Sequence, residues 1–437
     1  MTFTITSLRP TLCIFTLFIL FFFTLWSINR YFYTKLEEIE EITSEQSDIN
    51  INRKYCTADK CKFLFTYTVE EQESQSNRHF ESLIQIAQQL GRTMVLTNVE
   101  KSRISSRNHF PFNFYYNVDE LSKEFPQVKF ILQCEFQKWA EERYNKSDTI
   151  HVVLENSKSN PNYTVQYDTP YIDELVKEYE MDRFNLKLDN STIFKRISIG
   201  TNGRSPRKGG KNNDLKNFLS EELESNAEVM LITQKGIRGP IFERLTPIPY
   251  ASHITNAASN LTNQLKPYIA IHWRMESAKL NLMPKCAESL VTYLRNLSLT
   301  TGITTIYLAT DYPLAEYKNK TAQSETFSHI YEEHHTAMKI LNSSLNINTW
   351  VSTHALDYLQ LTLDPTKKEL LLKELSGGGI QGIFDKLILI QADYFIGGPK
   401  NCCRYLSTYT LQVEEARMQL LKNNGTIKNK IDRWKLY

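Results

Sequence analysis

The sequence lacks several features that would point to a metal ion or to a polyanionic partner. Its seven cysteines are scattered and include no Cys-x-x-Cys pair, so a structural zinc site is not expected. It has no Asp-x-Asp pair to hold a divalent cation, and no internal repeat is evident. The formal net charge of the 437 residues is only +2, which argues against a chain dedicated to nucleic acid.

A long uncharged run stands near the N-terminus, from residue 11 to residue 28. Its eighteen residues are about the shortest length that spans a bilayer. We interpret residues 11–28 as a transmembrane signal anchor, residues 1–10 as a cytosolic tail and the acidic, polar residues 29–55 as a solvated stem. A cleaved signal peptide is the alternative, although no clear cleavage site follows.

Cysteines and glycosylation sequons favour the secretory pathway. Six cysteines lie outside the anchor, an even number that suits an oxidising compartment. Their pairing cannot be deduced, but the neighbours Cys402 and Cys403 suggest a local disulfide constraint. Eight Asn-x-Ser/Thr sequons permit a lumenal location. We therefore expect a single-pass type II protein of the Golgi or endoplasmic reticulum membrane.

The remaining chain alternates strand and helix patterns. Short apolar segments that predict strands are residues 62–68, 93–97, 128–132, 149–155, 228–233, 268–274, 304–311 and 387–398. Most are continuously apolar, as in a parallel sheet covered by helices on both faces. Residues 79–92 have helical spacing that ends at Gly91, and residues 286–297 form a second helical pattern. This order predicts an α/β fold.

We expect two α/β domains, residues 56–255 and residues 256–437. The boundary is placed where residues 246–260 interrupt the apolar runs. The Gly-rich, basic residues 201–214 are expected to form a surface loop, with contact to an anionic ligand as the less favoured interpretation. In such folds ligands bind at the carboxyl ends of the strands.

Polar side chains follow three of the predicted strands. The first strand leads into His272, Arg274 and Glu276 at alternate positions, so they point the same way. The second strand ends at Asp311, and the third leads into a loop rich in hydroxyl groups. Because parallel strands end at one edge of a sheet, we expect these groups to form a site there.

An arginine at the end of a buried strand requires an anionic partner. The planar guanidinium of Arg274 matches two oxygens of a phosphate group. The hydroxyls of Ser407, Thr408 and Thr410 can donate to the same group, so that a departing diphosphate is stabilised without a metal. The alternative is an internal ion pair of Arg274 with Glu276 or Asp311.

Several motifs together resemble one enzyme family. The segments "IAIHWRMES", "IYLATD" and "DKLILIQADYFIGGPKNCCRYLSTYT" resemble the GDP-fucose protein O-fucosyltransferase superfamily, and so do "ESQSNRHFESLIQIAQQLGRTMVL" and "PFNFYYNVDEL". The resemblance covers about residues 60–420. It implies a GT-B architecture, in which two Rossmann-like domains face each other across a cleft.

The resemblance assigns roles to residues of the second domain. Arg274 matches an arginine that contacts the phosphates and the glycosidic oxygen, and His272 matches the histidine before it. Asp385 matches the acidic residue that reads guanine, because a carboxylate can accept from N1–H and N2–H₂. Ser407 and Thr408 match a hydroxyl pair on the β-phosphate.

Further assignments concern two residues of the first domain and two more of the second. Asn77 matches an asparagine near the sugar and phosphate, and Glu73 is the candidate general base by position. Solvated surface acids are the alternative interpretation of Glu73 and its neighbours. Arg417 is matched to a later family arginine, and Glu276 is expected to be a partner of Arg274 rather than a base.

The sequence thus predicts an inverting glycosyltransferase that moves fucose from GDP-fucose to a hydroxyl of a protein or glycan. The N-terminal domain would take the acceptor and the C-terminal domain GDP-fucose, with no metal or other cofactor and no nucleic acid. The membrane would be contacted through the anchor. The alternatives are a related transferase for another nucleotide sugar and an inactive lumenal binding protein with the same fold.

Overall fold

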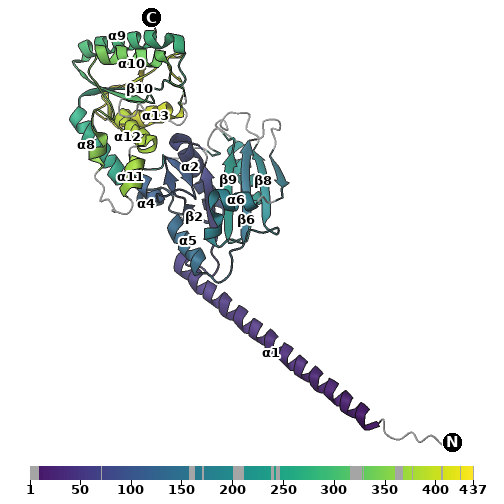
Figure 1. The fold of residues 1–437 in the computed structure, drawn as a ribbon. Helices are drawn as coiled ribbons and strands as arrows, with labels where there is room; N and C mark the ends of the chain where they lie inside the picture. The colour runs from purple at the N-terminus through teal and green to yellow at the C-terminus, as the bar shows by residue number, and fades with distance from the viewer. Residues whose placement is uncertain are drawn as a thin grey trace, which may run out of the picture.

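The structure is a computed structural model. It describes residues 9–69, 71–156, 163–169, 172–199, 211–237, 241–242, 247–314, 327, 329–359, 368–375, 377–404, 407–423 and 425–436. Within these residues the strands form two separate sheets, each packed with helices, and a long N-terminal helix projects from the first (Figure 1).

The first sheet is mostly parallel and comes from the N-terminal half. Its strands are β1 (Phe63–Val69), β2 (Thr93–Leu96), β3 (Val99–Glu100), β4 (Arg103–Ser105), β5 (Phe130–Leu132), β6 (Thr149–Asn156), β7 (Thr164–Tyr167), β8 (Ile193–Ile199) and β9 (Val229–Lys235). The order is β3-β4-β1-β9-β6-β8-β7; in addition β2 pairs with β1, and β5 pairs with β2. Strands β1, β6 and β9 are almost wholly buried, which explains their continuous apolar runs.

The second sheet is parallel throughout. It consists of β10 (Tyr268–Trp273), β11 (Thr305–Thr310), β12 (Ile347–Asn348), β13 (Tyr394–Gly397) and β14 (Asp432–Arg433). The order is β12-β11-β10-β13-β14, so β10 is central. His272 of β10 lies opposite Ala309 of β11 and Gly397 of β13. The residues that follow these three strands therefore emerge at one edge.

Helices cover both sheets. Those of the first half are α2 (Glu73–Gln89), α3 (Phe112–Tyr115), α4 (Val118–Glu124), α5 (Gln133–Glu142), α6 (Ile172–Tyr179), η1 (Met181–Phe184) and α7 (Lys211–Glu222). Those of the second are α8 (Ser252–Leu265), η2 (Leu280–Leu282), α9 (Met283–Thr301), α10 (Glu332–Ser344), η4 (Ala355–Tyr358), α11 (Lys368–Leu375), α12 (Gly378–Gln391) and α13 (Thr408–Lys422). Alternate residues of β10 face two different cores, one shared with α9 and one with α8 and α12.

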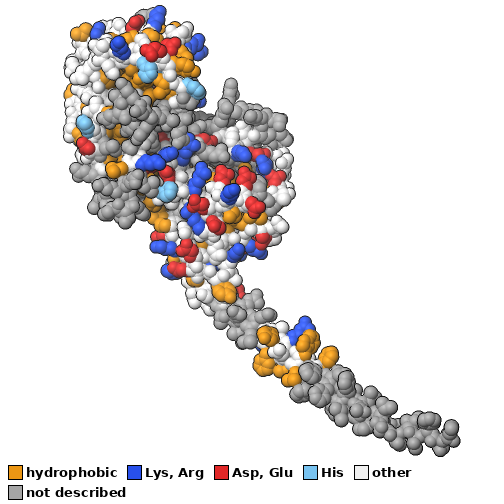
Figure 2. Space-filling view, viewed as in Figure 1, with side chains coloured by type: hydrophobic (Ala, Val, Ile, Leu, Met, Phe, Trp, Pro, Cys, Tyr) orange, Lys and Arg blue, Asp and Glu red, His pale blue; other side chains and the backbone are white. Residues whose placement is uncertain are grey.

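The two halves meet through α11, α12 and α13. Helix α13 contacts α2, and one hydrophobic core runs across the junction. At Gly379 a Cβ atom would lie 2.6 Å from the backbone of Lys101, so only glycine permits this approach. Beside it, Glu374 accepts hydrogen bonds from the backbone N–H of Lys101 and from the hydroxyl of Tyr115. Figure 2 shows acidic and basic side chains interspersed over this face of the first half, as the near-zero net charge implies.

Most of the predicted elements agree with the structure, but one is wrong in part. Helix α2 ends just before Gly91, whose φ of +58° suits the residue after a helix. The predicted strand at residues 387–398 is instead the end of α12 followed by the short β13. A continuous apolar run is common to buried helices and buried strands, and periodicity does not separate them.

The predicted boundary between residues 255 and 256 falls within α8, which packs on α12 of the second half. Most of the predicted loop at residues 201–214 lies outside the described residues, and residues 211–214 open α7. The predicted domain limits stay predictions.

A single helix, α1 (Arg9–Cys56), includes all of the predicted anchor and stem. Residues 1–8 of the predicted tail lie outside the described part of the chain. The last turns of α1 pack on α5, where Trp139 Nε1 donates to Asn52 Oδ1 at 2.9 Å and Arg143 pairs with Asp48. No helix in the described part of the chain is long and apolar enough to cross a membrane.

The cysteines form two disulfides, Cys56–Cys61 and Cys286–Cys402. The disulfide suggested at Cys402 and Cys403 does form, through Cys402, but it is not local, because the partner of Cys402 lies 116 residues away. Cys402 instead joins the start of α9 to the loop after β13, and Cys403 is a buried free thiol. Adjacent cysteines in the sequence did not identify the partner, because pairing depends on which Cβ atoms the fold brings together.

Candidate active site

The site begins at the carboxyl edge of the second sheet, where β10 leads into His272 and Arg274. His272 Nδ1 lies 3.0 Å from Thr410 Oγ1, and its ring is 4.7 Å from the ring of Tyr409. Burial lowers the pKa of His272 to about 3, helped by the nearby charges of Arg274, Arg433 and Lys386. The imidazole is therefore neutral at physiological pH and acts as a hydrogen-bonding group.

Arg274 forms an ion pair with Glu276, one of the two internal pairs considered from the sequence. The pair is partly accessible to solvent, because the Arg274 side chain is 21% exposed and that of Glu276 is 13% exposed. Asp311, at the end of β11, accepts from the backbone N–H of Met275 at 2.7 Å and of Glu276 at 3.1 Å. The loop after Arg274 is thus fixed by the neighbouring strand.

The N-terminus of α13 carries the predicted hydroxyl pair. Ser407 is the N-cap, and its Oγ accepts from the backbone N–H of Thr410 at 3.0 Å. Ser407 Oγ also lies 2.7 Å from Thr410 Oγ1, which contacts His272. Thr408 is the first helical residue. The start of this fifteen-residue helix is the positive end of its dipole, which favours an anion.

Asp385 lies on α12, and its charge acts on Tyr409 of α13. It is 5% exposed, and its Oδ1 accepts from the hydroxyl of Tyr307 at 2.5 Å. Burial raises the pKa of Asp385 to about 7, although hydrogen bonds from Tyr307 and Gln381 oppose this. The role of Asp385 in reading guanine stays a prediction.

Glu73 and Asn77 lie together in the first turns of α2 rather than in a loop. Asn77 Nδ2 donates to Glu73 Oε1 at 2.8 Å. The other Glu73 oxygen accepts from Ser74 at 2.9 Å and pairs with Lys386 of α12, across the junction of the two halves. Both predicted residues are buried, so the interpretation of Glu73 as a solvated surface acid is wrong.

Lys386 and Tyr250 are contacts of this site that the sequence did not reveal. Tyr250 donates to Glu73, and Lys386 also contacts the Tyr250 hydroxyl at 3.2 Å. The sequence feature that indicates such a contact is a lysine within the mostly apolar residues 383–390. A charge in a buried helix requires a partner, but the sequence does not say which one.

Arg417 is a structural residue in this fold. It is fully buried, and it donates to backbone carbonyls that include those of Leu389, Ala392 and Asn429. Burial lowers the pKa of Arg417 to about 10. Its hydrogen bonds tie the end of α12 to the segment before β14, so its role is to hold the second sheet together.

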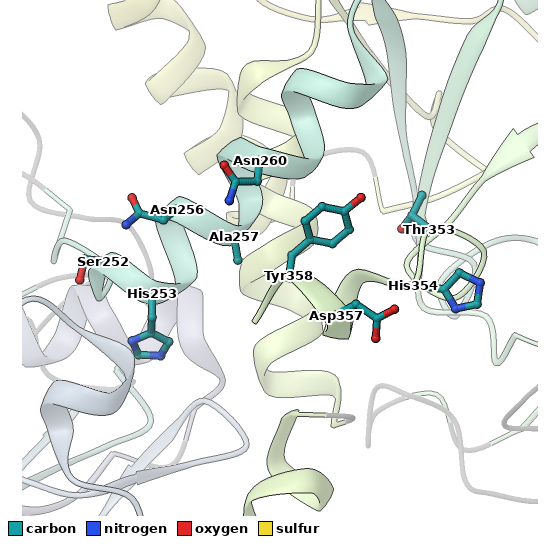
Figure 3. A pocket seen from close by; sticks show the side chains of 9 residues that line it. All are labelled: Ser252, His253, Asn256, Ala257, Asn260, Thr353, His354, Asp357 and Tyr358. Atoms are coloured by element: carbon teal, nitrogen blue, oxygen red, sulfur yellow. The ribbon is translucent and has the colours of Figure 1, made fainter. Parts of the chain in front are cut away.

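A cavity of about 700 Å³ lies between α8 and the segment that contains η4. Its lining residues are Ser252, His253, Asn256, Ala257, Asn260, Thr353, His354, Asp357 and Tyr358. Figure 3 shows the α8 side chains on one side and residues 353–358 on the other. None of these nine is Lys or Arg, so the lining offers no fixed cation to a diphosphate. Elsewhere, too, the described residues include no cluster of three or more His, Cys, Asp or Glu side chains suited to a metal ion.

Parallel strands that deliver an arginine, a histidine and a helix N-terminus to one edge define a nucleotide-binding α/β protein. The model of the GDP-fucose protein O-fucosyltransferase family matches residues 74–417, well over half of the chain. The chain belongs to this family and is a GDP-fucose glycosyltransferase.

Solved structures with a similar fold include POFUT1 in complex with GDP and POFUT1 in complex with GDP-fucose. The first is 15% identical, with 86% of this chain and 98% of that chain covered and a TM-score of 0.41. The second is 14% identical, with 88% and 100% covered and a TM-score of 0.43. No curated protein matches the chain.

Proposed function

We propose that the chain transfers fucose from GDP-fucose to a hydroxyl of a protein or glycan acceptor, with inversion and without a metal ion. The proposal includes a GT-B arrangement, in which the second α/β half binds the donor and the first faces the acceptor. The observation that carries it is the placement of Arg274 and the α13 N-terminus at one edge of the second sheet, linked through His272 and Thr410.

In the proposed reaction the acceptor oxygen forms a bond to C1 of fucose from the face opposite the diphosphate. The bond between C1 and the β-phosphate oxygen breaks, and its electron pair leaves with GDP. Arg274 and the N–H and hydroxyl groups at the start of α13 stabilise the charge that accumulates on GDP. His272, neutral and bonded to Thr410, orients this group of donors. The acceptor proton passes to a base, for which Glu73 is the candidate.

Glu276 is the proposed counter-ion of Arg274 in the free enzyme. Its carboxylate neutralises Arg274 while no donor is bound. Both side chains are partly exposed, so a diphosphate can replace the carboxylate as the partner of the guanidinium. The exchange keeps Arg274 paired at each stage, which avoids an uncompensated charge near the buried end of β10.

For the base of the nucleotide, Asp385 is the proposed reader. Its carboxylate can accept from N1–H and N2–H₂ of guanine, a pair of donors that adenine does not offer. Tyr307 and Gln381 already hydrogen-bond to Asp385, so guanine has to displace one of them. A bidentate contact of this kind discriminates between bases by about 1–3 kcal/mol.

Location in the secretory pathway and a membrane anchor at residues 11–28 belong to the proposal as well. The two disulfides support an oxidising compartment. In α1, side chains between Phe23 and Tyr33 are exposed and largely aromatic or aliphatic, as Figure 2 shows for this helix. Such a surface is unfavourable in water and favourable at a membrane interface.

Nucleotide binding tests the proposed function. GDP, GDP-fucose, UDP and ADP are titrated into the purified chain by calorimetry, and release of GDP from GDP-fucose is followed with candidate acceptors. The guanine nucleotides are expected to bind roughly tenfold or more tightly than UDP and ADP. Asp385→Asn should reduce that preference, whereas Asp357→Asn in the separate cavity should not. Equal binding of all four ligands would contradict the proposal.

A further inference from the structure

The carboxylate of Glu73 is buried at the junction of the two halves and is fully hydrogen-bonded. Its side chain is 8% exposed. Oε1 accepts from Asn77 and from the Tyr250 hydroxyl, and Oε2 accepts from the Ser74 hydroxyl and from Lys386. Two of the four donors are hydroxyl groups, so the carboxylate already receives hydroxyl hydrogens in the geometry that general base catalysis requires.

Lys386 is the cation of this cluster, and it comes from the other half of the molecule. Its ammonium group contacts Glu73, the Ser74 hydroxyl at 3.1 Å, the Tyr250 hydroxyl at 3.2 Å and Gln412 Oε1 at 2.7 Å. The side chain is 3% exposed. Each charge of the pair would be unstable at this depth without the other.

The pair borders the donor side of the site. Lys386 Nζ lies 5.1 Å from the centre of the Tyr409 ring, and that ring lies 4.7 Å from the His272 ring. The charge of Lys386 contributes to the lowered pKa of His272. The ammonium group of Lys386 is thus separated from the imidazole of His272 by one aromatic ring.

Three phenol groups also act on Glu73. They are Tyr250 before α8, Tyr116 after α3 and Tyr409 of α13. Glu71 does not contribute a second carboxylate to the pair, since it contacts His79 at 3.2 Å. Burial would raise the pKa of Glu73, but the charge and hydrogen bond of Lys386, with those from Tyr250 and Ser74, outweigh it and lower the pKa.

We propose that Lys386 is a positioning residue for the transfer reaction, which keeps the buried Glu73 carboxylate ionised and oriented so that it can accept the proton of the acceptor hydroxyl. This inference rests on the proposed function. In the step concerned, the acceptor oxygen bonds to C1 of fucose, the bond from C1 to the diphosphate breaks, and the O–H proton passes to Glu73. The acceptor hydroxyl takes the place of one of the two hydroxyls that donate to Glu73 in the structure.

Removal of the lysine charge should change the protonation of Glu73. In Lys386→Met the carboxylate of Glu73 stays buried without a cation, so it takes up a proton at a higher pH than in the unchanged protein. At neutral pH a protonated Glu73 cannot act as a base. Lys386→Arg keeps the positive charge and is expected to retain most of the activity.

The experiment measures kcat and KM for fucose transfer between pH 5 and pH 9. The variants are Lys386→Met, Lys386→Arg and the control Lys430→Met, which removes the more exposed Lys430–Glu414 pair. In Lys386→Met the acid limb of kcat should move up by roughly 1–3 pH units, with a smaller change in the KM for GDP-fucose. Lys386→Arg and Lys430→Met should keep the profile of the unchanged chain. A Lys386→Met profile that is unchanged, or lowered equally at every pH, would overturn the inference.

A double variant covers the case in which Lys386→Met does not fold. Glu73→Gln with Lys386→Met removes both charges, so no lone charge remains buried. If Lys386 acts through Glu73, this double variant and Glu73→Gln should have the same kcat at each pH. A further loss in the double variant would show that Lys386 acts on its own and would overturn the positioning role. Absence of any transfer by the unchanged chain would overturn the proposed function, whereas transfer with parallel pH profiles would overturn only the role of Lys386.

Discussion

The Asp311 carboxylate accepts a hydrogen bond from the backbone N–H of Met275 at 2.7 Å, and so joins the end of β11 to the loop after β10. Its other oxygen accepts from the N–H of Glu276. Both carboxylate oxygens of Asp311 thus accept from backbone N–H groups. Its role is to fix the backbone on which Arg274 stands, and activity should depend on it for that reason.

Asp311→Asn should therefore lower kcat/KM while the protein remains folded. The amide has one oxygen, so one of the two backbone N–H groups loses its acceptor, at a cost of about 1–3 kcal/mol. A displaced Arg274 should reduce kcat/KM roughly 10-fold or more. The control is Asp59→Asn, which removes an exposed ion pair with Arg53. Equal kinetics in both variants would rule out a positioning role for Asp311.

Arg274→Ala should lose roughly 10²-fold or more in kcat, because the charge that forms on departing GDP loses its main partner. Arg274→Lys keeps the charge but lacks the planar fork, and is expected to recover only part of the loss. Steady-state kinetics with saturating GDP-fucose measure both variants, and circular dichroism checks the fold. Full activity of Arg274→Ala would remove this residue from the mechanism.

Glu276→Gln should strengthen the binding of the nucleotide. The amide no longer competes with a diphosphate for Arg274, so GDP should bind more tightly. Partly exposed ion pairs contribute about 0.2–1 kcal/mol, which corresponds to a gain of up to roughly fivefold. Calorimetric titration with GDP gives the dissociation constant, and Glu288→Gln on the outer side of α9 is the control. Weaker binding in Glu276→Gln would mean that Glu276 helps to hold the nucleotide.

The part of this site that lies on parallel strands could be predicted from the sequence. Runs such as residues 268–271 are continuously apolar because helices cover both faces of the sheet, and the polar residues that follow such runs must share an edge. The strand pattern alone therefore predicts that His272 and Asp311 lie at the same edge, and the register of β10 and β11 confirms it.

The part that lies on helices could not be predicted in the same way. The contact of Glu73 with Lys386 joins residues 313 positions apart, and it depends on how the two halves pack. Residues 387–391 show the same limit locally, since their apolar run suits a buried helix as well as a strand. Both failures come from tertiary packing, which no local pattern encodes.

Asp385 should make stability depend on pH. In the folded protein its pKa is about 7, whereas its ordinary value is 3.8. Between these values the folded state holds more protons than the unfolded chain, so the free energy of unfolding falls as the pH rises through this window. Asp385→Asn has no such group and keeps an acceptor for the Tyr307 hydroxyl.

The free energy of unfolding of Asp385→Asn, relative to the unchanged chain, should thus increase by about 2–4 kcal/mol between pH 4 and pH 8. Urea unfolding at pH 4, 6 and 8 measures the difference. Asp189→Asn, at an exposed turn, serves as the control and should shift far less. A constant difference between Asp385→Asn and the unchanged chain would show that Asp385 titrates normally in the fold.

The two disulfides should differ in what they contribute to stability. Cys286–Cys402 closes a loop of 116 residues, whereas Cys56–Cys61 closes one of only 5. A longer loop removes more conformational entropy from the unfolded chain, with expected contributions of about 4–5 kcal/mol and about 2 kcal/mol. The paired alanine variants Cys286→Ala/Cys402→Ala and Cys56→Ala/Cys61→Ala are compared by urea unfolding. Cys134→Ala, at an exposed free thiol, is the control for loss of a sulfur atom.

Loss of Cys286–Cys402 should also affect catalysis, because Cys402 lies in the loop beside β10. Its carbonyl accepts from Trp273 Nε1 at 2.8 Å, and Trp273 stands between His272 and Arg274. The paired variant at Cys286 and Cys402 should therefore lower kcat, while that at Cys56 and Cys61 should leave kcat nearly unchanged. Equal losses of stability in the two pairs would contradict the loop-length argument, and an unchanged kcat would show that Trp273 holds its position without the disulfide.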